Sequence, residues 1–82
     1  MAIHFLEGAT MFAPNEYDGK HKVFEETYLS AGHQKTADAA FRVLESIRDS
    51  HPTSKGWVEF EAGVQQLPDG NWQAFRMHAK YE

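Results

Sequence analysis

Apolar and polar residues alternate in two runs near the C-terminus, over residues 58–65 and 74–81. An alternation with a period of two is typical of β-strands that bury one face. The segment between the runs contains Pro68, Asp69 and Gly70, which are residues that favour tight turns. The pattern therefore predicts a β-hairpin.

The burial pattern also predicts how the two strands of this hairpin pair. A loop of two residues (69–70) or of four (68–71) sets Val64 opposite Phe75 and Val58 opposite Tyr81, so that apolar residues share one face. A loop of three residues sets apolar residues opposite charged ones. Because a slip by one residue turns every side chain to the other face, we expect the first register.

The first register gives the hairpin an outer face with a polar centre and aromatic ends. It places Leu67 opposite Trp72 at the tip, with Trp57 at the far end of the same face. In the polar centre of this face we expect Glu59 opposite Lys80 and Glu61 opposite His78.

A helix is predicted to begin after Thr36, whose hydroxyl can accept a hydrogen bond from the first turn. Apolar residues then recur at helical spacing and form one stripe: Ala37, Ala40, Phe41, Leu44 and Ile47. Pro52 disfavours helical backbone at His51, so we expect the helix to end there.

The N-terminal third is less regular. Residues 2–12 fit a strand, and the turn-forming residues of 13–20 fit a loop. Residues 21–33 fit either a helix or a strand. We choose a strand, because a short loop after a first strand most often returns the chain antiparallel.

Together these elements predict an α+β fold in a single domain that spans residues 1–82. Its four-stranded antiparallel sheet has the order β-β-α-β-β along the chain, and one helix packs on one face. The residues expected in the core are Ile3, Phe5, Phe24, Phe41, Leu44, Ile47, Val58, Phe60, Val64, Phe75, Met77 and Tyr81.

The composition indicates the cellular compartment of the protein more clearly than its function. The 82 residues include no cysteine, which excludes disulfides and thiolate metal sites and favours the cytoplasm. His4, Glu7 and Gly8 interrupt the apolar N-terminal stretch, so we expect neither a signal peptide nor a membrane span. The formal net charge of −4 works against non-specific binding to DNA or to anionic lipid.

The sequence shows no arrangement typical of catalysis. Ser30 near His33 and Ser50 beside His51 are interpreted as turn and cap residues, and the pair Glu25 and Glu26 would point to opposite faces of a strand. The five histidines lack metal-ligand spacing. We therefore expect a non-enzyme without a metal or a cofactor.

The outer face of the hairpin is the expected binding surface, because tryptophan and arginine are enriched at the centres of protein interfaces. Its residues are Trp57, Leu67, Trp72, Arg76, His78 and Lys80. We expect a protein–protein interaction domain that uses a sheet face or an edge strand, with another protein or a second copy as its partner. An inhibitor or regulator of a host complex, of the phage or mobile-element type, is the specific form that we expect.

The alternative is a nucleic-acid-binding module. In it Trp57 and Trp72 would stack on bases, and Arg76 and Lys80 would contact phosphates. Glu59 and Glu61 on the same face weigh against this alternative.

Overall fold

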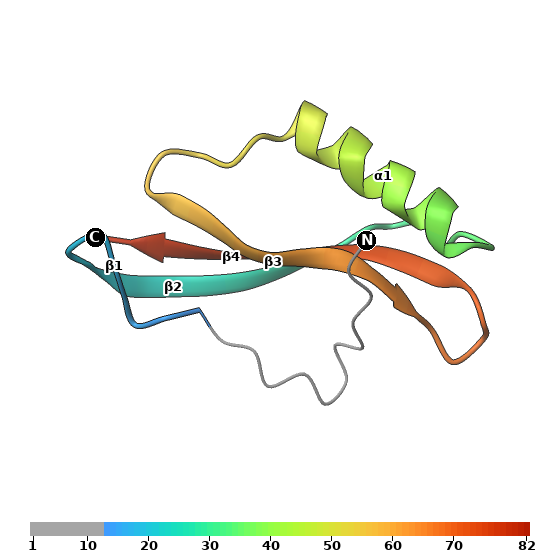
Figure 1. The fold of residues 1–82 in the computed structure, drawn as a ribbon, viewed down its shortest axis with the longest axis horizontal. Helices are drawn as coiled ribbons and strands as arrows, with labels where there is room; N and C mark the ends of the chain where they lie inside the picture. The colour runs from blue at the N-terminus through green and yellow to red at the C-terminus, as the bar shows by residue number, and fades with distance from the viewer. Residues whose placement is uncertain (1–12) are drawn as a thin grey trace.

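The computed structural model describes residues 13–82 and shows one antiparallel sheet with a helix on one of its faces (Figure 1). The sheet has the strand order β1-β2-β4-β3. The elements in chain order are β1 (Glu16–Tyr17), β2 (Lys20–Leu29), α1 (Ala37–Ser50), β3 (Trp57–Gln66) and β4 (Trp72–Tyr81). The predicted α+β class and the order β-β-α-β-β are confirmed.

The first two strands differ in part from expectation. The strand expected over residues 2–12 lies outside the described residues, and β1 falls within the segment 13–20 that was expected to be a loop. Asp18 and Gly19 both have positive φ angles, 53° and 74°, and join β1 to β2 by a two-residue turn. Such a turn matches the twist of the strands on either side of it. The choice of a strand for the ambiguous segment is confirmed for residues 21–29.

The helix begins and ends where the sequence predicts. The Thr36 hydroxyl accepts a hydrogen bond from the Ala39 N–H at 3.1 Å, and so caps the first turn. At the other end His51 is the C-cap residue, directly before Pro52. Ala40 and Leu44 bury the apolar stripe against the sheet.

The turn between β3 and β4 has a three-residue loop, so the predicted register is wrong. The Gly70 N–H donates to the Leu67 carbonyl at 2.9 Å, and the Leu67 N–H donates to the Asn71 carbonyl at 2.7 Å. Gly70 has a φ of 86°. This combination, a tight turn closed by a left-handed glycine, is the common geometry of three-residue hairpin loops.

The three-residue loop moves every pair near the turn by one residue. Trp72 lies opposite Gln66 instead of Leu67, and Arg76 lies opposite Ala62. A β-bulge between Glu59 and Glu61 then shifts the register again. Beyond the bulge the pairs are Glu59 with His78, Val58 with Ala79 and Trp57 with Lys80. The expected pairs Glu59 with Lys80 and Glu61 with His78 are therefore wrong as well.

As a consequence, apolar residues lie on both faces of the sheet. On the helix side, Val64 and Ala74 pack with the helix residues Ala40 and Leu44. On the opposite side, Ala79 and Tyr81 pack with Ala13, Val58 and Phe60. The bulge separates the two groups of β3 residues that the alternation had placed on one face.

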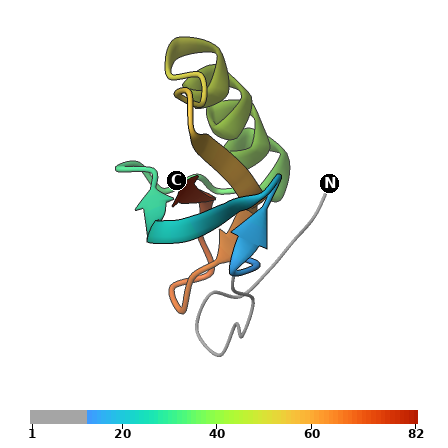
Figure 2. The same cartoon turned by 90° about the vertical axis from the view of Figure 1, so that its left-hand side faces the viewer.

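The helix covers only part of the sheet. It packs on β4 and β3, and the end view in Figure 2 shows it next to β3 with β2 farther away. Phe24 of β2 was expected in the core, but 54% of its surface is exposed. The helix therefore leaves β2 uncovered, and the loop that follows the helix extends beyond its end.

Candidate functional site: a cavity below the helix end and an open strand edge

The predicted binding residues of β4 lie on the helix side of the sheet and not on an outer face. Trp72 is half-buried and packs on the core cluster of Ala40, Leu44 and Val64. The expected outward orientation of this tryptophan is therefore wrong. Its indole strengthens the helix–sheet contact instead of forming an outer tip with Leu67.

Trp57, Arg76 and His78 lie together on the helix side of the sheet, at the end that the helix does not reach. The ring centroids of Trp57 and His78 are 6.5 Å apart in an edge-to-face arrangement, and Trp57 contacts Phe24 in the same manner at 5.8 Å. Lys80 is half-buried and pairs with Glu82 at 3.3 Å. Leu67 lies apart from these residues, in the hairpin turn.

Arg76 is the most buried charged residue among the described residues, with 4% of its side chain exposed. Its Nε–H donates to Glu59 Oε1 at 2.7 Å, and its Nη1–H donates to the His51 carbonyl at 2.9 Å. A longer bond of 3.4 Å joins Nη2 to the hydroxyl of Thr53. Arg76 therefore ties β4 to β3 and to the end of the helix, whose last carbonyls attract a cation.

Glu59 is shared between two arginines. Arg48 of the helix donates to both oxygens of the Glu59 carboxylate while Arg76 donates to one of them. Burial alone would raise the pKa of Glu59, but the hydrogen bonds from Arg48 and Arg76 outweigh it and lower the pKa below the usual value of 4.5. Glu59 is therefore ionised at neutral pH.

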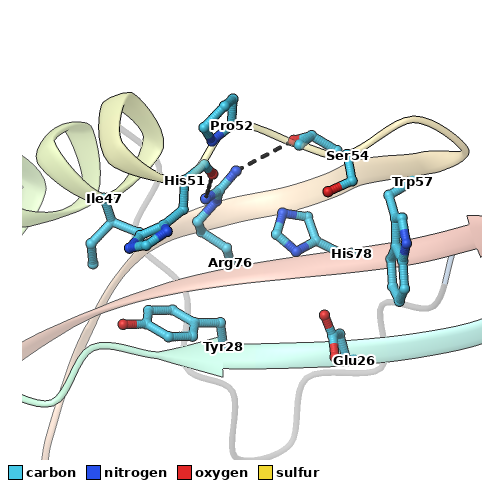
Figure 3. A pocket seen from close by; sticks show the side chains of 10 residues that line it. Glu26, Tyr28, Ile47, His51, Pro52, Ser54, Trp57, Arg76 and His78 are labelled. Atoms are coloured by element: carbon cyan, nitrogen blue, oxygen red, sulfur yellow. Dashed lines mark hydrogen bonds between the residues drawn. The ribbon is translucent and has the colours of Figure 1, made fainter.

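A cavity of about 440 Å³ opens between this cluster and the loop that follows the helix (Figure 3). We call it the Arg76 cavity. Tyr28, His51, Trp57, Arg76 and His78 are among the residues that line it, and Glu26 lies at its margin. Figure 3 shows Tyr28 and Trp57 at opposite ends of the cavity, with Arg76 and His78 between them. β2, β4 and the 51–54 segment each contribute to the lining.

His78 lies in this cavity as a neutral imidazole. Burial is the main cause that lowers its pKa below 6.5, and the nearby positive charge of Arg76 lowers it further. Its Nε2 atom is buried and has no hydrogen-bond partner in residues 13–82. A buried polar atom without a partner is rare in folded proteins and costs free energy.

A second candidate surface is the strand β2, which carries most of the exposed apolar residues of residues 13–82. Val23, Phe24, Tyr28 and Leu29 each expose between 45% and 54% of their surface, and Tyr17 of the neighbouring β1 exposes 51%. Adjacent residues of a strand point to opposite faces. Both faces of β2 are therefore apolar and open to solvent.

In residues 13–82 no strand pairs with the outer edge of β2 beyond Lys22. β1 pairs with Lys20 and His21, and the Lys22 N–H donates to the Asn15 carbonyl at 2.8 Å. The Ser30 N–H donates to the Ala74 carbonyl of β4, and backbone groups alternate in direction along an antiparallel strand. Thr27 and Leu29 consequently turn their N–H and C=O groups toward the free edge.

The sequence did not lead us to expect that the Glu59 carboxylate bridges Arg48 and Arg76, or that the apolar residues of β2 are exposed. The adjacent apolar pairs Val23–Phe24 and Tyr28–Leu29 carry a signal, because one covering helix cannot bury both members of such a pair. No local signal marks Glu59, since its partners lie 11 and 17 residues away in the chain.

Residues 13–82 contain no group of three or more metal-ligating side chains placed to hold an ion. Within the same residues no helix has the length and apolarity that a membrane span requires. The chain matches no protein-family model, and comparisons with curated proteins and with solved structures find no significant match. The geometry of the two surfaces is therefore the basis for assigning a function.

Proposed function

We propose that the protein is a non-catalytic interaction domain that binds another protein by adding a strand to the open edge of β2. The observation that carries this proposal is the position of the exposed large apolar side chains. Those of residues 13–82 all lie on β1 and β2: Tyr17, Val23, Phe24, Tyr28 and Leu29. Concentrated apolar exposure on one element is typical of an interaction site.

Strand addition uses both features of β2. The N–H and C=O groups of Thr27 and Leu29 that face the outer edge, where no strand of residues 13–82 pairs with them, supply main-chain hydrogen bonds. The exposed side chains on the two faces supply selectivity. Natural proteins usually protect a long apolar edge by charge, proline or a covering element. A protein partner provides that protection when it binds.

The charged residues of β2 indicate which side chains a partner strand should carry. Glu26 is exposed, whereas Glu25 is held by the Lys22 ammonium at 3.0 Å and by the Ala13 N–H at 3.1 Å. An apolar partner strand with a basic side chain next to Glu26 complements this edge, since opposite charges on neighbouring strands attract. Inhibition of a host complex by a phage- or mobile-element-type protein is the form of such binding that we propose, with the cytoplasm as its compartment.

The alternative of nucleic-acid binding gains no support from the positions of its proposed contacts. Arg76 is buried and paired with Glu59, and Trp72 packs beneath the helix. Neither side chain lies on an exposed surface, where the backbone and bases of a polynucleotide would meet it. Binding through phosphate contacts is strongest at low salt and weakens steeply as salt is added. We expect no binding to mixed-sequence oligonucleotides even at low salt.

A substitution at Thr27 tests the strand-addition proposal. Thr27→Pro removes an N–H that faces the open edge, and proline is tolerated at such positions because no ladder bond is lost. Thr27→Ala keeps the N–H and serves as the matched control. The tagged chain is recovered from its native host with each variant, and the bound protein is quantified; light scattering of the purified chain detects a second copy.

We expect both variants to keep the circular dichroism spectrum of the unmodified chain, and only Thr27→Pro to lose the partner. Equal recovery of the partner with both variants would rule out the β2 edge. Loss with both variants would mean that the Thr27 side chain, and not its backbone, makes the contact.

A further inference from the structure

The Arg76 cavity shares Glu26 and Tyr28 with the β2 surface, but the strand-addition proposal does not use its Arg76, His78 and Trp57. It lies on the helix side of β2 and β4, below the 51–54 segment, and not at the free edge (Figure 3). Its volume of about 440 Å³ lies within the range of small-molecule sites. The side chains that line it can therefore be considered as a ligand site in their own right.

The charge on Arg76 is incompletely compensated. Arg76 and Arg48 share the single carboxylate of Glu59. Arg48 is 40% exposed and is therefore partly solvated, but Arg76 is 4% exposed and is not. A buried guanidinium without a carboxylate of its own attracts an anion, because charge interactions strengthen away from water.

Arg76 also has hydrogen-bond donors to spare. A guanidinium carries five N–H groups. Three of them are directed at Glu59, the His51 carbonyl and the Thr53 hydroxyl, which leaves two without a partner in residues 13–82. A planar carboxylate is the anion whose geometry best matches a guanidinium.

The other residues that line the cavity favour a ligand with a flat, apolar body. Tyr28 and Trp57 face the cavity from its two ends, and Ile47 closes it on the helix side. His78 is neutral and its Nε2 atom has no partner among the described residues. Aromatic walls with a few placed polar groups are typical of sites for small organic molecules.

We propose that the Arg76 cavity binds a small organic monocarboxylate with a flat apolar body. The carboxylate accepts hydrogen bonds from the spare N–H groups of Arg76, and the body lies between Tyr28 and Trp57. Glu26 is exposed at the margin, directly across the strands from His78. Its negative charge disfavours a second carboxylate on the ligand and so selects for monoanions.

Binding of benzoate, monitored by NMR of the backbone amides and the indole N–H groups, tests this proposal. The two tryptophans report on different places, because Trp57 lines the cavity and Trp72 packs beneath the helix. Benzamide is the neutral probe of the same shape, and acetate is the carboxylate without the body. We expect a dissociation constant for benzoate of about 0.1 to 1 mM, which lies within the bounds on binding free energy per non-hydrogen atom for a small ligand.

Two substitutions on β2 provide a matched pair for the same titration. Tyr28→Ala removes a wall of the cavity, and Leu29→Ala removes a side chain of similar exposure on the opposite face of the strand. We expect at least a fivefold loss of benzoate affinity with Tyr28→Ala and none with Leu29→Ala. Arg76→Gln should abolish binding, and Tyr28→Ala keeps the proposal testable if that variant does not fold.

The supporting result is a saturable change at the Trp57 indole with benzoate and at least tenfold weaker binding of benzamide and of acetate. Equal binding of benzoate and benzamide would overturn the role of Arg76. The absence of saturation up to about 20 mM benzoate, or changes centred on the opposite face of β2, would overturn the site.

Discussion

Arg76 of β4 donates its Nε–H to Glu59 of β3 at a distance of 2.7 Å, and this bond joins two residues that are both largely buried. The same carboxylate holds Arg48 of the helix. Three elements therefore meet at one carboxylate, so replacement of Glu59 should lower the stability of the fold.

Replacement of Glu59 by glutamine should lower the free energy of unfolding by about 2 to 4 kcal/mol, because it leaves the buried Arg76 without a counter-charge. Glu45→Gln is the control: Glu45 is exposed on the same helix as Arg48, and we expect a change within about 0.5 kcal/mol. Urea denaturation of the two variants measures the difference. Equal small effects would contradict a structural role of the Arg76–Glu59 pair.

Glu59 should also contribute to unfolding in acid. Its pKa in the folded chain is lower than 4.5, so the unfolded chain binds protons first as the pH falls below about 4.5. The contribution to stability is present above that pH and is lost as the pH falls through the folded pKa. We expect Glu59→Gln to show a shallower loss of stability over this range than the unmodified chain, and an unchanged slope would contradict this prediction.

His78 should give a separate pH dependence near neutrality. Burial and Arg76 lower its pKa in the folded chain below 6.5, so the unfolded chain takes up a proton first as the pH falls through about 6.5. Stability is therefore present above this pH and declines below it. His78→Gln should flatten the curve of unfolding free energy between about pH 7 and pH 5, measured by urea denaturation at each pH. A curve as steep as that of the unmodified chain would contradict a buried neutral His78.

The three-residue hairpin loop depends on Gly70. Its φ of 86° is strained for any other residue, and nothing lies within 4 Å of an added Cβ, so the cost of Gly70→Ala is conformational. We expect a loss of about 1 to 2 kcal/mol. Gly32→Ala is the control, since Gly32 has no positive φ and an added methyl group would meet only the Gln34 side chain, at 3.4 Å. Thermal unfolding of both variants distinguishes them, and equal melting temperatures would mean that Gly70 does not hold a left-handed conformation.

The helix and the strands β3 and β4 were predictable because their signals are local. Thr36 marks the start of the helix and Pro52 follows its end, and the alternation over residues 58–65 identifies β3. The strand character of residues 21–29 was predictable only as a choice between two alternatives, because its apolar residues fit both periods.

The orientation of the hairpin was not predictable from alternation. Residues on both faces of β4 are apolar, with Trp72 and Ala74 on one side and Phe75 and Met77 on the other. A burial argument therefore could not choose between registers that differ by one residue. The turn sequence Pro68-Asp69-Gly70 supports the three-residue loop, because Gly70 takes its left-handed position.

The β-bulge and the burial of Arg76 explain the remaining differences between the predicted binding face of the hairpin and the structure. The bulge between Glu59 and Glu61 moves Trp57 to the helix side, which no alternating pattern can reveal. A charged residue is expected on a wet face unless it is paired. Arg76 can be buried because Glu59 and the His51 carbonyl accept its hydrogen bonds, and both partners come from distant parts of the chain.

Site-specific photo-crosslinking measures most directly whether the open edge of β2 is the binding surface. A photoreactive amino acid is placed at Leu29 of β2 in one variant and at Ser46, an exposed position of the helix, in the other. Irradiation in the native host should join the chain to one protein from position 29 and to none from position 46. A crosslink from position 46 alone, or the same crosslinked protein from both positions, would contradict binding at the β2 edge.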